Sequence, residues 1–201
     1  MLSAVDAINI IGQKLLPNFK LEDPKMLECY EKVFNVFSKS LEIGTRGTKS
    51  VFLIGSKGVG KSACMRVMNA LFRDTERTFR YIKGSELVKM LDLMKPAEIK
   101  ERYGFECKSD LYIDDIGLAQ VVKKEYGNEI NIISEILIER YDLFISEGFK
   151  THLSSNRFFN IDRVKVPDAP RTIYEMYGDV VCDRIKEMAT IITWQGESLR
   201  K

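Results

Sequence analysis

The chain has 201 residues, of which 45% are hydrophobic and 30% are charged. This length and balance are typical of one ordinary globular domain, which buries a sizeable core without disulfides or metals to support it. The 31 basic and 29 acidic side chains leave a formal net charge of +2. This net charge is too small to indicate binding to nucleic acid or to a membrane.

The cysteines and the N-terminus indicate the compartment. Cys29, Cys64, Cys107 and Cys182 show neither CxxC nor Cys/His spacing, which argues against a zinc site and a disulfide framework and fits a reducing cytosol. The first residues lack the basic start and long apolar core of a signal peptide. No run approaches the roughly 20 apolar residues that cross a bilayer. We therefore expect a cytoplasmic protein with no membrane association.

Two helical patterns come first along the chain. Apolar side chains recur at helical spacing across residues 2–16, and Pro17 ends this pattern. A second pattern runs over about 24–41, with Asp23 in the N-cap position and a proline in the first turn. We expect this segment, residues 1–47, to pack on or flank the rest of the chain, or to dock a partner.

Strands and helices alternate across residues 48–201, which we expect to form the core domain. The expected strands are 51–55, 79–83, 111–114, 151–155 and 189–194, and the expected helices lie at about 61–72, 85–94, 97–104 and 128–146. Such alternation predicts an α/β fold in which helices flank a central parallel five-stranded sheet.

One stretch between the first strand and its helix has the spacing of a phosphate-binding loop. Its glycines let the backbone N–H groups point toward a phosphate, and the following helix adds the positive end of its dipole. Lys61 can reach the β- and γ-phosphates, and the Ser62 hydroxyl can bind Mg²⁺. We interpret the following residues as a nucleotide-binding loop rather than a glycine-rich turn: Gly55, Ser56, Lys57, Gly58, Val59, Gly60, Lys61 and Ser62.

Polar side chains follow two later strands. Asp114 and Asp115 end the strand in LYIDD, where Asp114 would bind the metal through water and Asp115 would polarise an attacking water. Asn156 follows THLSS, where its amide could orient that water or touch the γ-phosphate. Turn or cap roles are the alternative for each. We expect His152, in the same strand, to be packed or exposed rather than catalytic.

Two arginines near the C-terminus have the chemistry to stabilise charge on a transferring phosphoryl group. Arg184 lies in the helical segment YGDVVCDRIKEM, and Arg200 lies in GESLR. Their spacing alone does not distinguish this role from that of ordinary surface arginines.

The ordered set of the phosphate loop, LYIDDIG, ILIERY, THLSSN, YGDVVCDRI and GESLR resembles the DnaC/IstB-type AAA+ ATPases. These include bacterial helicase loaders and transposition helper ATPases, and the resemblance covers roughly residues 48–201. It implies a P-loop NTPase fold of AAA+ type without a C-terminal lid domain, with ATP and Mg²⁺ as cofactors.

The resemblance also implies roles for single residues. The loop would be Walker A, and Asp114 and Asp115 would be the Walker B pair, although many members have glutamate where Asp115 stands. Asn156 would be the sensor-1 residue. Arg184 would be the arginine finger that acts on the nucleotide of a neighbouring subunit, and Arg200 resembles a sensor-2 arginine.

By the same resemblance, the protein would be a slow ATPase stimulated by oligomerisation or DNA. It would form a homo-oligomer in the ATP state on single-stranded DNA or on a protein partner, a replicative helicase or a transposase. The long connection 84–109, with Lys89, Lys95 and Lys100, could follow a DNA strand. A small-molecule kinase and a nucleotide-binding adaptor without turnover are the alternatives.

Overall fold

The protein, a computed structural model, is described for residues 3–17, 19–42, 48–117, 122–125, 128–161 and 168–194. Its elements in chain order are α1 (Ala4–Leu15), α2 (Pro24–Glu42), β1 (Ser50–Ile54), α3 (Lys61–Leu71), β2 (Phe79–Lys83), α4 (Gly84–Met90), α5 (Pro96–Tyr103), β3 (Asp110–Asp114), β4 (Val122–Glu125), β5 (Asn128–Asn131), α6 (Ile132–Glu147), β6 (Thr151–Ser155), α7 (Ile173–Met188) and β7 (Ala189–Thr193).

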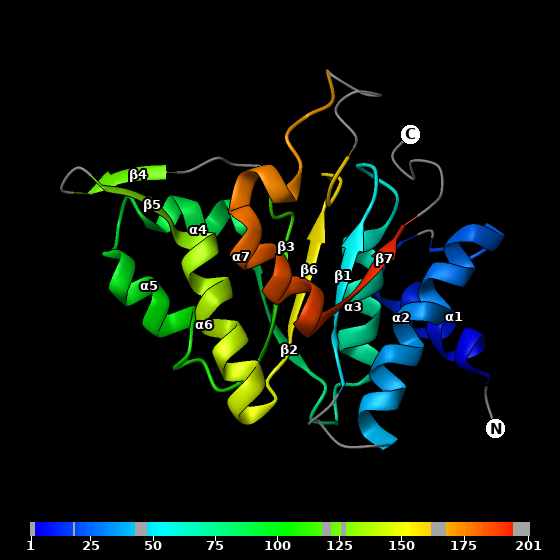
Figure 1. Cartoon of the computed structure of the whole chain (residues 1–201). Helices are drawn as coiled ribbons and strands as arrows, with labels where there is room; N and C mark the ends of the chain where they lie inside the picture. The colour runs from blue at the N-terminus through cyan, green and yellow to red at the C-terminus, as the bar shows by residue number, and fades with distance from the viewer. Residues whose placement is uncertain are drawn as a thin grey trace.

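The central sheet has five strands in the order β2-β3-β6-β1-β7, and every neighbouring pair is parallel. The predicted five-stranded parallel sheet is therefore confirmed. Because the strands all run the same way, their carboxyl ends meet at one edge, at the top of Figure 1. This order places β1, β3 and β6 side by side, and these are the strands that precede the predicted site residues.

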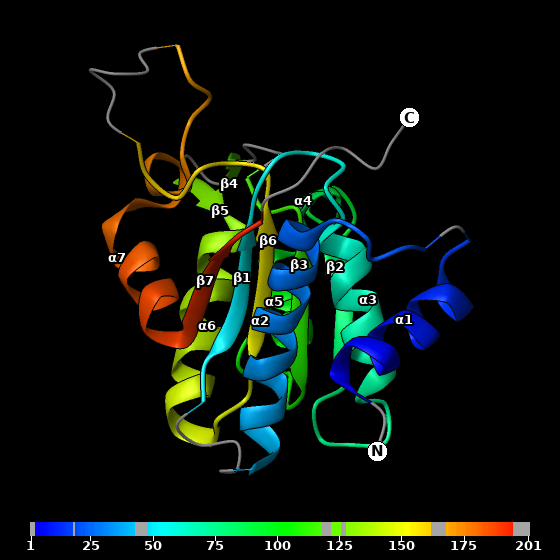
Figure 2. The same ribbon diagram turned by 90° about the vertical axis from the view of Figure 1, so that its right-hand side faces the viewer.

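Helices cover both faces of the sheet, so the domain has three layers (Figures 1 and 2). α1, α2 and α3 lie on one face, and α4, α5, α6 and α7 lie on the other. Alternation along β1 shows why both faces need cover: Val51 and Leu53 pack into the first layer of core, and Phe52 and Ile54 pack into the second. All four side chains are buried.

The N-terminal helices contribute to the core on the α3 face. Ile8 of α1 and Tyr30 and Phe37 of α2 are buried in the same cluster as Val51. α2 begins as predicted, because the Asp23 side chain accepts a hydrogen bond of 2.9 Å from the N–H of Lys25. A domain boundary between residues 47 and 48 stays a prediction.

The helix predicted over about 128–146 starts later than expected. Residues 128–131 instead form β5, which pairs antiparallel with β4 in a separate two-stranded sheet. Asn131 then caps α6, since its side chain accepts a hydrogen bond of 3.2 Å from the N–H of Ser134. The polar sequence of β4 gave no strand pattern, so this hairpin was missed.

The helix predicted over 85–94 is also shorter, because α4 ends at Met90 and turns follow. Pro96 opens α5, and the residue before a proline avoids the helical region. Lys95 accordingly has an extended backbone with ψ of 149°. Among the described helices, none is both long and apolar enough to cross a membrane.

Candidate nucleotide-binding site

The loop between β1 and α3 encloses a small cavity at the carboxyl edge of the sheet. Gly58 and Gly60 have φ of 88° and 98°, a left-handed conformation that side chains other than glycine rarely adopt. The cavity has a volume of about 210 Å³. It is lined by Lys57, Gly58, Gly60, Lys61, Ser62, Ala63, Asp115 and Asn156.

Lys61, the first residue of α3, is directed along the loop rather than into solvent. Its ammonium group donates to the carbonyl oxygens of Gly55 at 2.7 Å and Ser56 at 2.8 Å, and to Oδ1 of Asn156 at 2.7 Å. Three acceptors therefore fix a cation at the wall of the cavity, within the first turn of a helix whose dipole is positive at this end.

Asn156, just past β6, connects Lys61 to Asp115. Its Oδ1 accepts from the lysine, and its Nδ2 donates to Oδ1 of Asp115 at 3.0 Å. These two contacts fix the orientation of the Asn156 side-chain amide, with its oxygen toward Lys61 and its nitrogen toward Asp115. Asp115 has φ of 57°, and this turn of the backbone aims its carboxylate at the cavity instead of along the strand direction. The N–H of Asp115 donates to Oγ of Ser154 at 2.9 Å, which stabilises the turn.

Asp114, at the end of β3, accepts hydrogen bonds from four hydroxyl groups in the described part of the chain. Oδ1 accepts from Ser62 at 2.9 Å, from Tyr112 at 2.6 Å and from Ser154. Oδ2 accepts from Tyr81 at 3.2 Å. Burial raises the pKa of Tyr112, and the nearby Asp114 charge raises it further, so this phenol stays a donor.

The donor set fits a magnesium ion held together with nucleotide phosphates. Ser62 donates its proton to Asp114, which leaves its oxygen lone pairs for a cation, and both side chains offer the hard oxygen ligands that Mg²⁺ prefers. In the described part of the chain, no three His, Cys, Asp or Glu side chains are grouped closely enough to hold a metal by themselves. A cation here would therefore depend on ligands from the nucleotide.

Val59 and Arg184 are predicted site residues that are not among those that line the cavity. Val59 is buried, and its carbonyl accepts from the indole Nε1 of Trp194 at 2.6 Å. Arg184, on α7, does not line the cavity, and its guanidinium lies over the ring of Tyr141, 5.1 Å from the centroid. Arg200 lies outside the described residues.

No family model matches the sequence, and no curated protein matches it either. Solved structures do match the fold. DnaI superposes with a TM-score of 0.60 at 17% identity, covering 96% of this chain and 93% of that chain. The DnaC helicase loader gives 0.58 at 14% identity over 89% of this chain and 95% of that chain. Replication initiator DnaA bound to AMPPCP and single-stranded DNA gives 0.51 at 18% identity, over 90% of this chain and 49% of that chain.

The chain has the fold of DnaI and of the DnaC helicase loader. The resemblance read from the ordered motifs is thereby confirmed at the level of fold. At these identities the superposition carries no residue roles, so each role in this protein rests on its own contacts.

Sequence reasoning missed several residues around the candidate site. These residues are Tyr81 on β2, Ser154 on β6 and Trp194, which directly follows β7. Tyr81 and Ser154 donate to Asp114, and Trp194 donates to the carbonyl of Val59. The sequence predicts strands at these positions but no site role for the three side chains. Only the strand order would have identified them, since it decides which strand ends are neighbours.

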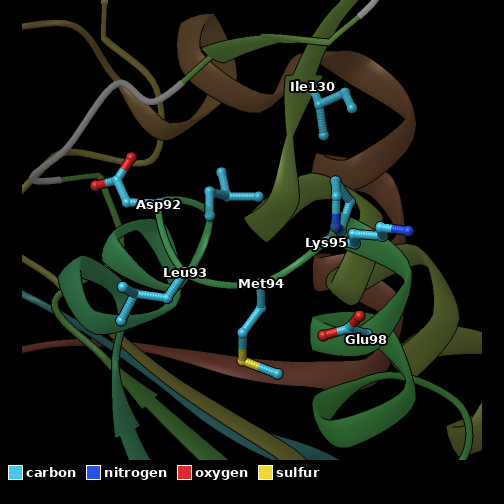
Figure 3. A pocket seen from close by; sticks show the side chains of 8 residues that line it. Asp92, Leu93, Met94, Lys95, Glu98 and Ile130 are labelled. Atoms are coloured by element: carbon cyan, nitrogen blue, oxygen red, sulfur yellow. The ribbon is translucent and has the colours of Figure 1, made fainter.

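A second hollow of about 390 Å³ shares no lining residue with the candidate cavity and lies between the α4–α5 connection and β5 (Figure 3). Ile130 and Met94 border it, and Leu93 beside them is 86% exposed. It contains none of the residues that the sequence predicted for the site.

Proposed function

We propose that the protein binds and hydrolyses ATP and acts as an assembly ATPase of the helicase-loader kind. One observation carries this proposal: a continuous chain of hydrogen bonds joins Lys61, Asn156 and Asp115 around the cavity of the phosphate loop. It combines a phosphate-binding cation, a polar side chain and a carboxylate, the groups that ATP hydrolysis requires.

Phosphate binding would use groups that are already oriented. The N–H groups of the loop and the start of α3 favour an anion at the cavity. The β- and γ-phosphates would replace the acceptors of Lys61, which are two loop carbonyls and the Asn156 amide. Nucleotide binding would thus free the Asn156 oxygen while leaving its contact with Asp115 intact.

Ser62 and Asp114 would hold Mg²⁺, which when bound supplies positive charge against the phosphate oxygens. Asp115 lines the cavity, so its carboxylate could accept a proton from an attacking water. Asn156 would orient both that water and Asp115. This proton acceptor is one methylene shorter than glutamate, which favours a slow reaction.

Arg184 would act on the nucleotide of a neighbouring subunit. Its guanidinium does not line the cavity of its own chain, as such a role requires, and it packs half-buried over the Tyr141 ring of α6, with Nη1 buried. An arginine supplied by another copy makes turnover depend on assembly, so we propose a homo-oligomer in the ATP state.

The proposed partners are single-stranded DNA and a replicative helicase, with a transposase as the alternative. Support comes from the DnaC helicase loader and from DnaA, the latter solved with AMPPCP and single-stranded DNA. Lys89 and Lys95 are exposed for a DNA contact, whereas Lys100 already pairs with Glu135 at 3.4 Å and Glu139 at 3.1 Å. Charge reversal at Lys89 and Lys95 should weaken binding at low salt.

The first experiment is ATP turnover per subunit against protein concentration, with and without single-stranded DNA. Turnover should rise with both, and Arg184→Ala should abolish the rise. Arg171→Ala is the matched control, because this exposed arginine lies just before α7 and, among the described residues, donates to the backbone carbonyl of Glu175.

Mixing variants tests whether the site is completed between subunits. The Asp115→Asn variant lacks the proton acceptor but keeps Arg184. The Arg184→Ala variant lacks the arginine but keeps the Asp115 carboxylate. A mixture should recover turnover that neither has alone. Turnover that is flat with concentration and unchanged by DNA would overturn the assembly mechanism. Binding without turnover would favour the adaptor, and labelled phosphate on an acceptor would favour the kinase.

A further inference from the structure

The metal-side carboxylate, Asp114, has an unusual number of hydroxyl partners. It is 4% exposed and accepts from four hydroxyl groups that come from four directions. Ser62 approaches from α3, Tyr81 from β2, Tyr112 from the strand of Asp114 itself and Ser154 from β6. The proposed function uses only the Ser62 contact, so the two phenols need an explanation of their own.

The register of the sheet explains why the phenols converge. Tyr112 and Asp114 are two residues apart on β3, so both side chains lie on the α3 face. Tyr81 is the parallel partner of Tyr112 on the edge strand β2, and the two ring centroids are 5.7 Å apart. Two neighbouring positions on adjacent strands thus direct two O–H donors to one carboxylate.

The two oxygens of Asp114 have different environments. Oδ1 accepts three of the hydroxyls, including that of Tyr112 at 2.6 Å, and is saturated. Oδ2 accepts only Tyr81 among the hydroxyl bonds of the described residues, at 3.2 Å, and keeps capacity for another donor. Tyr112 is fully buried, whereas Tyr81 is 40% exposed. The saturated oxygen is thus fixed from inside, and the open oxygen lies on the solvent side.

We propose that Tyr112 and Tyr81 are positioning residues that set the affinity of the nucleotide site for Mg²⁺. Tyr112 fixes the plane of the Asp114 carboxylate, so that Oδ1 always takes the proton of Ser62 and the Ser62 lone pairs face the cavity. Tyr81 limits the rotation of Oδ2, leaving it directed at a water of the bound cation. This inference rests on the proposed nucleotide site and goes beyond it, because it assigns two residues that do not touch nucleotide or metal.

The test measures nucleotide binding rather than turnover. A fluorescent ATP analogue is titrated first in EDTA and then at increasing Mg²⁺, with the unaltered protein, Tyr112→Phe and Tyr81→Phe. In EDTA all three should bind equally, since the phenols contact the metal-side groups Asp114 and Ser62 rather than the phosphate-binding Lys61. Tyr112→Phe should need about tenfold more Mg²⁺ for half of the gain in affinity, as is typical when a partner of a metal ligand is removed. Tyr81→Phe should show a smaller shift in the same direction.

Tyr103→Phe is the matched control, because Tyr103 is 8% exposed and packs on the other face of the sheet. A structural role alone would lower the thermal midpoint without changing the Mg²⁺ requirement. If the buried Tyr112→Phe does not fold, the half-exposed Tyr81→Phe carries the test by itself. Unchanged Mg²⁺ dependence in the folded variants would overturn the inference while leaving nucleotide binding intact. No binding by the unaltered protein at any Mg²⁺ concentration would instead overturn the proposed function, and the inference with it.

Discussion

The indole Nε1 of Trp194 donates to the carbonyl oxygen of Val59 at 2.6 Å, across 135 residues of sequence. The backbone of Trp194 also donates to Ile54 at 2.6 Å. The residue after β7 therefore supports the loop between β1 and α3 at Val59. The fit is close: a Cβ on Gly55 would lie 2.5 Å from the carbonyl oxygen of Trp194.

Trp194→Phe should lower the free energy of unfolding by about 2 kcal/mol, because a buried carbonyl loses its donor and the smaller ring leaves a cavity. Nucleotide affinity should fall with it, since the loop loses its support. Trp194 is the single tryptophan of the chain, so its fluorescence should change when ATP is added to the unaltered protein. Unchanged affinity in a folded Trp194→Phe variant would show that the loop holds its shape without this contact.

The Asp115→Asn variant should still bind nucleotide but should hydrolyse it much more slowly. Asparagine tolerates the positive φ of 57° at this position, so the fold and nucleotide affinity should persist. Turnover should fall by about 100-fold or more, because the proton acceptor is lost. Single-turnover hydrolysis of labelled ATP measures the chemical step. A variant that turns over at the normal rate would assign proton transfer to another group.

Asn156→Ala should also reduce turnover while sparing affinity. Its amide links Lys61 to Asp115, but the two loop carbonyls at 2.7 and 2.8 Å still anchor the lysine without it. We expect a loss of about tenfold or more, as when one orienting donor is removed from an active site. A comparison of nucleotide affinity with turnover in the same preparation distinguishes this outcome from misfolding, which would reduce both.

His152 should make stability depend on pH. Burial, with help from the nearby Lys150, Arg140 and Arg77 charges, lowers its pKa from 6.5 to about 3. Between these values the unfolded chain binds a proton that the folded chain does not, so stability is present above pH 6.5 and is lost as pH falls toward 3.

His152→Gln removes this dependence and keeps an acceptor near the N–H of Val51, which donates to the His152 ring at 3.1 Å. The stability advantage of the unaltered protein should shrink by about 1.4 kcal/mol per pH unit below the unfolded pKa. Comparing the two proteins matters because Asp110 opposes the trend: burial raises its pKa to about 6, which favours folding as pH falls. Parallel stability curves would contradict the prediction.

Arg140 should be a major contributor to stability. Its fully buried guanidinium donates to the carbonyls of Cys107 at 2.7 Å, Ser109 at 3.0 Å and Lys150 at 2.8 Å. Arg140→Leu should cost about 3 kcal/mol in the free energy of unfolding, because these buried acceptors lose their donors together. The exposed Arg73→Leu should change it by no more than about 0.5 kcal/mol. Equal denaturation midpoints for the two variants would refute this role.

The sequence by itself determined the features that depend on neighbours along the chain. The eight contiguous residues Gly55 to Ser62 contain the glycines, the cation and the hydroxyl on which the prediction of a phosphate loop rests, so that prediction needs no distant residue. Periodicity located all five strands of the central sheet, because a strand or helix with one or two buried faces repeats its apolar residues at a fixed interval. The acidic pair at 114–115 was predicted from local sequence too, because both aspartates directly follow the apolar residues of a strand.

Only the tertiary structure decided what surrounds these residues. The β4–β5 hairpin depends on pairing between two polar segments, which no apolar period marks. The contacts of Tyr81, Ser154 and Trp194 depend on the order β2-β3-β6-β1-β7, because that order sets which side chains from distant parts of the chain meet. Free energy gained between strands far apart in sequence selects that order, and such pairing leaves no trace in a local window.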